Sequence, residues 1–147
     1  MGKSPQPNPS EAPNFDPDTV TLVADDHFFA RNLLVEMLRA IGFQVIHSAA
    51  DGPKTVLAFE LYHPKLLFLD IEMPEISGLE VLRRIRESDK EIFIAIVSAH
   101  SSVENVQEAL KNGANGFIVK PYTYRKVVEI VRKWAASKPA SSLRSGD

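Results

Sequence analysis

Cysteine is absent from the 147 residues of the chain. Its absence excludes disulfides, thiol catalysis and zinc sites built on thiolates. A strong excess of either charge is also missing, because 17 basic residues stand against 19 acidic ones and the formal net charge is −2. This balance gives no electrostatic reason to expect direct binding to nucleic acid.

Long apolar runs are missing as well. No stretch of the sequence approaches the ~18 apolar residues that a transmembrane helix needs, and the amino terminus lacks the apolar core of a secretory signal. We therefore expect a cytoplasmic protein without membrane contact. The sequence also has no glycine-rich phosphate loop, and Ser98 has no His–Asp pattern that would make it a hydrolase nucleophile.

The composition predicts one domain between two tails. Half of the 10 prolines fall within the first 18 residues, where few apolar residues accompany them. We expect residues 1–18 to form a disordered, proline-rich tail and residues 139–147 to form a flexible polar tail. Residues 19–138 are long enough to bury a core of their own.

Short apolar runs alternate with helical patterns throughout this central part. The runs cover residues 20–24, 44–48, 66–69, 92–97 and 117–119. The helical patterns cover residues 27–40, 53–63, 79–87, 101–112 and a segment that begins at 123. The alternation predicts an α/β fold, a flavodoxin-like (βα)5 domain whose five-stranded parallel sheet has the strand order 2-1-3-4-5. In the first helix, the residues expected to be buried are Phe28, Leu34, Met37, Leu38 and Ile41.

Polar residues follow four of these runs. They are Asp25 and Asp26, Asp70, Ser98, and Lys120. The carboxyl ends of parallel strands meet at one edge, so these groups should converge. Carboxylates ~4.8 Å apart on adjacent strands repel one another, and a divalent cation with oxygen ligands, such as Mg²⁺, relieves that conflict. Either Asp25 or Asp26 is also expected to cap the following helix.

These positions resemble the receiver domain of two-component response regulators, in particular its stand-alone, chemotaxis-regulator-like form. The residues that carry the resemblance are Asp25, Asp26, Asp70, Ser98, Lys120 and Pro121. Residues 70–78 also match an Asp-x-x-Met-Pro-x-x-x-Gly pattern, and residues 113–117 resemble the family's Gly-Ala-x-x-aromatic turn. The resemblance extends over about residues 20–138.

The resemblance implies a role for each acidic position. Asp70 would be the phosphoacceptor, taking a phosphoryl group from a phosphohistidine on a histidine kinase or a histidine phosphotransfer protein. Asp26 and Asp70 would bind Mg²⁺ (or Mn²⁺) directly and Asp25 mainly through water, with the backbone carbonyl of Glu72 as a further ligand.

The resemblance also assigns the phosphoryl-binding groups. Lys120 would pair with the phosphoryl oxygens, and the peptide bond between Lys120 and Pro121 would be cis. Ser98 would donate a hydrogen bond to the phosphoryl group, and the small Ala99 would leave its approach open. Glu72 and His100 would tune the phosphoryl lifetime.

The output is expected on the surface made by the fourth helix, the fifth strand and the fifth helix. Phe117 would be an aromatic switch that acts through packing alone. A downstream protein would contact the changed surface, which includes Val103, Val106, Tyr122 and Tyr124. We expect a monomer, at most a weak dimer.

Other functions remain open at this point. The chain could act as a phosphorelay shuttle or a phosphate sink, and the same fold could host a flavin protein or an aspartyl-phosphate phosphatase. The preferred interpretation is a non-enzymatic switch, with only self-phosphorylation and autodephosphorylation. The histidines, namely His27, His47, His63 and His100, lack ligand spacing and are expected to bind no metal.

Overall fold

The computed structural model describes residues 13–137. Residues 1–12 of the expected amino-terminal tail and the whole expected carboxy-terminal tail, residues 139–147, lie outside the described residues, as does residue 138. Strands and helices alternate along the described part, in the order β1 (Val20–Ala24), α1 (Phe28–Ile41), β2 (Val45–Ala49), α2 (Gly52–Tyr62), β3 (Leu66–Asp70), α3 (Gly78–Ser88), β4 (Phe93–Ser98), α4 (Val103–Lys111), β5 (Gly116–Val119) and α5 (Tyr124–Ser137).

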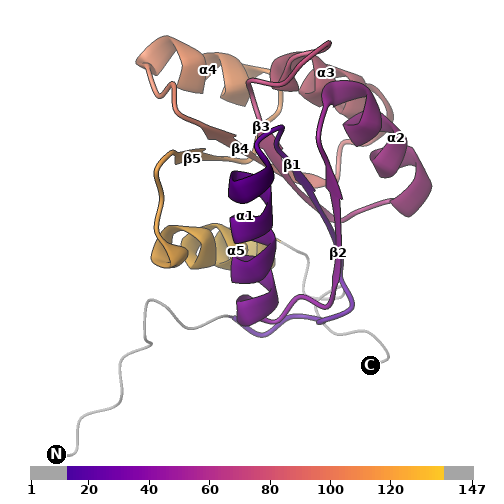
Figure 1. The fold of residues 1–147 in the computed structure, drawn as a ribbon, viewed down its shortest axis with the longest axis vertical. Helices are drawn as coiled ribbons and strands as arrows, with labels where there is room; N and C mark the ends of the chain where they lie inside the picture. The colour runs from indigo at the N-terminus through magenta and orange to yellow at the C-terminus, as the bar shows by residue number, and fades with distance from the viewer. Residues whose placement is uncertain (1–12, 138–147) are drawn as a thin grey trace, which may run out of the picture.

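The strands form one parallel sheet in the order β2-β1-β3-β4-β5, which confirms the predicted topology. Helices α1 and α5 cover one face of the sheet, and α2, α3 and α4 cover the other (Figure 1). The order of strands reverses at β1 and β3, so ligands should bind above their carboxyl ends. Within residues 13–137, no helix is both long and apolar enough to cross a membrane.

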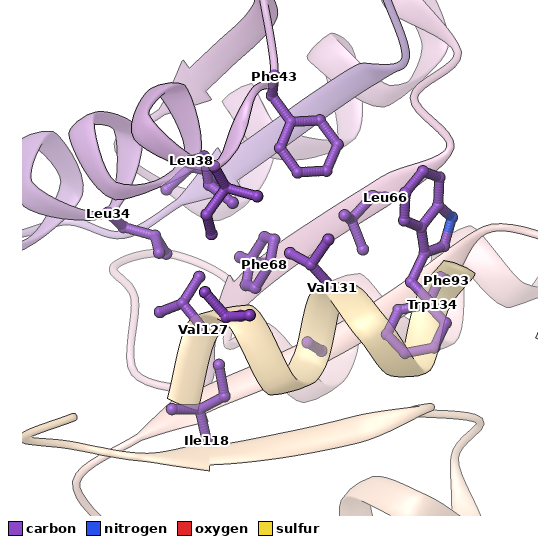
Figure 2. Close-up of a cluster of buried hydrophobic side chains, with 14 of the residues drawn as sticks. Leu34, Leu38, Phe43, Leu66, Phe68, Phe93, Ile118, Val127, Val131 and Trp134 are labelled. Carbon is purple, nitrogen blue, oxygen red and sulfur yellow. The ribbon is translucent and has the colours of Figure 1, made fainter. Parts of the chain in front are cut away.

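The central strands are buried on both faces, and their sequences are correspondingly apolar without alternation. In β3, Phe68 points into the core beneath α1 and α5, where it meets Leu38 and Val131 (Figure 2). Leu69 belongs to the second core, which includes Val81 of α3. Every residue of β3 is buried, and this includes the polar residue at its end.

The packed chain begins earlier than the boundary expected at residue 18. The ring of Phe15 lies 4.4 Å from the ring of Phe43 and 5.6 Å from that of Trp134, centroid to centroid. The carbonyl oxygen of Pro17 accepts a hydrogen bond of 2.9 Å from the backbone N–H of Gln44. The packing of Phe15 thus holds residues 13–18 against the core, although their proline content is typical of a tail.

The expectation that Phe28 is buried is wrong, because 58% of this residue is exposed. Phe28 lies in the first turn of α1, beyond the end of β1 at Ala24, where the sheet offers no apolar surface. Its ring instead contacts Phe29, with 5.4 Å between centroids, and the guanidinium of Arg31 at 5.7 Å. The core side of α1 is formed by Leu34, among others, as predicted.

Two buried threonines differ in how their hydroxyls are satisfied, and this predicts opposite effects on stability. Thr21 is 0% exposed and its hydroxyl has no partner among the described residues, whereas the hydroxyl of the equally buried Thr55 donates to the carbonyl of Asp51 over 2.7 Å. We expect Thr21→Val to raise the free energy of unfolding by about 1 kcal/mol and Thr55→Val to lower it by a similar amount. Urea denaturation of both variants measures this, and equal losses in the two would contradict it.

Candidate functional site

The predicted strand ends converge at the carboxyl edge of the sheet. Ala24 of β1 pairs with Leu69 of β3, so the residues that follow them, Asp25 and Asp70, stand on adjacent strands. Both are buried, at 5% and 3% exposure, and Ser98 at the end of β4 is fully buried. The sheet therefore brings together three polar groups from distant parts of the sequence, as predicted.

Lys120 connects the two buried carboxylates. Its Nζ lies 2.9 Å from Oδ2 of Asp25 and 3.0 Å from Oδ2 of Asp70. Burial alone would lower the pKa of the Lys120 ammonium, but its hydrogen bonds to Asp25 and Asp70, together with their charges, raise the pKa above its usual value. Lys120 therefore remains a cation at the edge of the sheet. The peptide bond between Lys120 and Pro121 is cis.

Asp70 is the carboxylate of this group whose charged form is disfavoured by burial. Burial raises the pKa of its carboxyl group, although the backbone N–H of Glu72, which donates to Oδ1 over 3.0 Å, and the Lys120 ammonium both act to lower it. The nearby charge of Asp25 raises it further. The two donors thus offset only part of the free-energy cost of burying the Asp70 carboxylate. An added cation would stabilise its charged form.

Asp26 and His27 complete the cluster on its solvent side. Asp25, Asp26, His27 and Asp70 each offer one ligand atom, and these four atoms lie within 4.8 Å of one another. Two ligands on opposite sides of an octahedral Mg²⁺ are at most about 4.2 Å apart. Small movements of these side chains would therefore bring their ligand atoms to the distances of a bound ion. Three carboxylates at this spacing fit a hard divalent cation.

One expectation about these residues is wrong. The N-cap of α1 is His27, so neither Asp25 nor Asp26 occupies the capping position. The Oδ1 of Asp25 instead accepts the backbone N–H of His27 over 2.9 Å. His27 is also the residue that the sequence interpretation missed, because it reaches the acidic group through the turn before the helix and not through any ligand spacing.

The β3–α3 and β4–α4 loops meet beside the acidic cluster. The Oγ of Ser98 accepts the backbone N–H of His100 over 2.9 Å, and the His100 ring contacts the carboxylate of Glu72 through Nε2. The backbone N–H of Lys120 donates to the carbonyl of Ser98 over 2.9 Å. Movement of Ser98 would therefore displace His100, which contacts Glu72 in the β3–α3 loop, and Lys120 after β5. Ala99 is exposed and lines an open cavity of about 340 Å³ together with Lys120.

Gly78 holds the start of α3 against the backbone of Asp70. A Cβ on Gly78 would lie 2.1 Å from the carbonyl oxygen of Asp70 and 2.7 Å from Cα of Ile71. The backbone N–H of Gly78 donates to the carbonyl of Ile71 over 2.7 Å. Only glycine permits this approach, which gives a physical reason for the last position of the residue 70–78 pattern.

Phe117 lies outside the acidic cluster. It is half-buried in β5 and packs against the core on the face covered by α2, α3 and α4. Helix α4 above it is weakly anchored, because Ala109 is the buried residue of this helix and Val103 is 66% exposed. A change at β5 could therefore move α4 at little cost in buried apolar area.

A family model, the response regulator receiver domain, matches residues 21–132. The chain belongs to this family. The receiver domain is similar to the chemotaxis protein CheY of Bacillus subtilis, with 34% identity over 112 residues, which cover 76% of this chain and 93% of the relative. It is also similar to CheY of Treponema pallidum, with 36% identity over 121 residues, which cover 81% and 83% of the two chains. It is thus a CheY-like receiver domain with an acidic pocket.

Two solved structures resemble the receiver domain along most of its length. The CheX–CheY complex of Borrelia burgdorferi with BeF₃ and Mg²⁺ matches with a TM-score of 0.73 and 34% identity, over 76% of this chain and 84% of that one. The signal receiver domain of NarL from Mycobacterium tuberculosis matches with a TM-score of 0.76 and 29% identity, over 82% and 98%. Receiver domains are in general signalling proteins without enzymatic activity of their own.

Proposed function

We propose that this receiver domain accepts a phosphoryl group on Asp70 from a phosphohistidine, carried by a histidine kinase or a histidine phosphotransfer protein, and that phosphorylation switches its contacts with other proteins. One observation carries the proposal. The buried carboxylate of Asp70 stands at the end of β3, and its Oδ2 lies 3.0 Å from the Lys120 ammonium. Asp25, which follows the adjacent strand β1, places a second carboxylate beside it. This is a nucleophile next to a fixed cation.

The transfer step follows from that placement. An oxygen of Asp70 forms the bond to phosphorus while the bond between phosphorus and the donor imidazole nitrogen breaks, and the electron pair leaves with that nitrogen. Charge spreads over the three equatorial oxygens of the phosphoryl group, so positioning and charge neutralisation dominate catalysis. Lys120 is placed to pair with one of these oxygens, because its Nζ already contacts Asp70.

The metal ligands in this proposal are the carboxylates of Asp26 and Asp70, the carbonyl of Glu72, and Asp25 through water. The close approach of the acidic oxygens, within 4.8 Å, supports the assignment. When bound, Mg²⁺ or Mn²⁺ would supply positive charge against the phosphoryl oxygens.

After transfer, the Ser98 hydroxyl is assigned to the phosphoryl group as a hydrogen-bond donor. Ser98 would leave the N–H of His100, and its backbone bond to Lys120 would carry the movement to β5. The contact between His100 and Glu72 spans the two loops beside Asp70. These two side chains would restrict the approach of water and so tune the phosphoryl lifetime, and the small Ala99 would leave room for the donor.

The output surface is assigned to α4, β5 and α5. The weak anchoring of α4 supports this placement, and inward rotation of Phe117 would couple it to Ser98. Full burial of a phenylalanine is worth ~1.5–3 kcal/mol, and a gain of about 1.4 kcal/mol already shifts a two-state equilibrium about tenfold. The partner would be a protein that contacts Val103, Val106, Tyr122 and Tyr124. The Borrelia relative, whose structure contains CheX, is a precedent for a receiver bound to another protein.

A small phosphodonor tests the proposal directly. We expect the full chain, incubated with the phosphodonor and Mg²⁺, to gain one phosphoryl group by intact mass, and peptide mapping to place it on Asp70. The same incubation with the divalent ion removed by a chelator should give little product. A phosphoryl group on any other residue at the same rate would overturn the assignment.

A further inference from the structure

The turn between α4 and β5 is held against α3 by one arginine side chain. The guanidinium of Arg86 donates from Nε to the carbonyl of Gly113 over 3.0 Å and from Nη2 to Oδ1 of Asn115 over 2.7 Å. Its Nη1 donates to the carbonyl of Asp89, at the end of its own helix, over 3.1 Å. The planar guanidinium presents its donors in a rigid fork, so Arg86 fixes the position of the turn relative to α3.

Two residues of the turn fit this contact. The Oδ1 of Asn115 also accepts the backbone N–H of Ile94 over 2.8 Å, and the backbone N–H of Asn115 donates to the carbonyl of Ile94 over 2.7 Å. Gly113 has a φ of +103°, and a Cβ there would lie 2.9 Å from Nε of Arg86. These four residues, the Arg86 network, therefore join α3, the α4–β5 turn and β4.

The carboxyl end of α4 is held to α3 by a second arginine. The Nε of Arg83 donates to Oδ1 of Asn112 over 3.2 Å, and its Nη2 lies 3.6 Å from Oε2 of Glu108. Ala109, the buried residue of α4, lies in the same half of the helix. The last turn of α4 is therefore fixed by polar side chains of α3 and by its own packing.

The amino end of α4 has no comparable connection to another helix within residues 13–137. The Oγ of Ser102 accepts the backbone N–H of Asn105, and the Asn105 side chain donates to the carbonyl of His100 over 3.3 Å. Both bonds stay within the β4–α4 loop and the first turn of the helix, and Val103 is 66% exposed. This end can thus be displaced without breaking a side-chain bond to a neighbouring helix.

We propose that the α4–β5 turn is the hinge of α4, so that phosphorylation moves the amino end of the helix while Arg83 and the Arg86 network keep its carboxyl end on α3. The inference rests on the proposed function, because the movement starts from phosphorylated Asp70 and passes through Ser98. Hinges are short segments at the ends of elements that absorb changes in backbone angles. A helix fixed at one end pivots, so the surface that changes most would be the one around Val103 and Val106.

A sliding movement of the whole helix makes a different prediction. If α4 moved past α3 as a rigid body, its carboxyl end would have to leave Arg83 and Arg86, and the amides of the turn would exchange faster. A pivoting helix leaves these amides protected. Hydrogen exchange of single amides reports such local opening and therefore separates the two movements.

The first measurement is amide hydrogen exchange of the unphosphorylated full chain, followed by NMR. We expect Arg86→Gln to speed the exchange of the Ile94 and Asn115 amides by at least about tenfold, the equivalent of about 1.4 kcal/mol and less than a typical hydrogen bond to a charged group. Arg84→Gln is the matched control, because it removes the same charge from α3 and Arg84 bonds to Glu80 of its own helix. It should leave both rates at their original values. Unchanged rates in Arg86→Gln would overturn the proposal.

A second variant covers the case in which Arg86→Gln does not fold. Arg86→Lys keeps the charge but lacks the fork that reaches Gly113 and Asn115 together. The Ile94 and Asn115 amides should again exchange faster than in the original chain. Original rates in Arg86→Lys would show that the fork does not hold the turn, and the proposal would be refuted.

The second measurement repeats the exchange on the original chain with BeF₃⁻ and Mg²⁺, which mimic the bound phosphoryl group. We expect the exchange rates of the amides of residues 105–107 to shift and those of residues 113–116 to stay at their original values. A shift as large at residues 113–116 as at residues 105–107, or no shift at either end, would overturn the hinge.

The outcomes distinguish this inference from the proposed function. The first measurement needs no phosphorylation, so it tests the Arg86 network even if intact mass shows no phosphoryl group on Asp70. If Asp70 gains the phosphoryl group and the exchange of α4 shifts at its carboxyl end, the hinge is refuted and the phosphoacceptor role of Asp70 stands.

Discussion

Replacing Asp70 by asparagine should abolish phosphoryl uptake and, in the metal-free protein, raise the free energy of unfolding. The amide has no anionic oxygen to attack phosphorus, so no slower uptake at this position is expected. The gain in stability follows from burial, because the pKa of the Asp70 carboxyl group is raised even with Lys120 and the Glu72 amide beside it. The raised pKa is the net effect of burial and of the favourable contact with Lys120. The charged form of Asp70 is therefore less favourable in the folded state than in the unfolded state.

The pH dependence follows from the same shift. An unfolded aspartate ionises near a pKa of ~3.9, and folded Asp70 ionises at a higher pH. In the interval between the two values the folded state binds more protons, so the stability of the original chain falls as pH rises. Asp70→Asn lacks this loss. The free energy of unfolding of Asp70→Asn should therefore exceed that of the original chain by an amount that increases as pH rises from about 4. This difference should become constant once folded Asp70 has ionised.

Urea denaturation with a chelator present, at several pH values, measures this difference. Glu87→Gln is the control, because Glu87 is an exposed carboxylate on α3 and its removal changes the net charge equally. It should show no comparable gain. Lower stability of Asp70→Asn over the whole range would contradict the argument, and so would phosphorylation at the original rate.

Gly78→Ala should destabilise the fold and also slow phosphorylation. The new Cβ would lie 2.1 Å from the carbonyl oxygen of Asp70 and 2.9 Å from its carbonyl carbon, and both are backbone atoms that cannot rotate away. We expect a loss at the upper end of the ~1–3 kcal/mol typical of overpacking. The backbone that moves carries the acceptor itself, and a displacement of about 1 Å at a reacting group can cost roughly a hundredfold in rate.

Gly116→Ala is the matched control for Gly78→Ala. A Cβ on Gly116 would meet Cδ1 of Ile130 at 3.0 Å, and this atom is the end of a flexible side chain. The cost should be much smaller, and the rate of phosphorylation should stay close to the original. If both alanine variants unfold at the same urea concentration and accept phosphate equally fast, the close approach of α3 has no role in placing Asp70.

The strand ends were predictable because apolar runs without alternation indicate strands buried on both faces. Each polar residue that follows such a run must then lie at the edge of the sheet, and this argument placed Asp25, Asp70, Ser98 and Lys120 correctly. The helix expected over residues 101–112 is also present, and it begins at Val103 because Ser102 occupies the N-cap, where its Oγ accepts the backbone N–H of Asn105.

The features that the sequence did not reveal depend on where a helix or segment meets the rest of the fold. The spacing of Phe28 fits the buried side of α1, but the sheet ends before it. His27 has no ligand spacing, and its contact with Asp26 arises from the path of the chain before α1. Phe15 stands in a proline-rich stretch, and nothing local indicates that Phe43 and Trp134 leave a surface for its ring.

The packing of Phe15 determines what the fluorescence of this protein reports. Trp134 is the one tryptophan of the chain, is 2% exposed, and lies against Phe15 and Phe43 at the amino edge of the sheet. The carboxylates lie at the opposite edge. Indole emission should therefore follow unfolding and remain silent when a metal binds. Burial raises the pKa of Tyr122, and the charges of Lys120, Asp25 and Asp70 act on its hydroxyl, so Tyr122 is the chromophore expected to respond to changes in the acidic pocket.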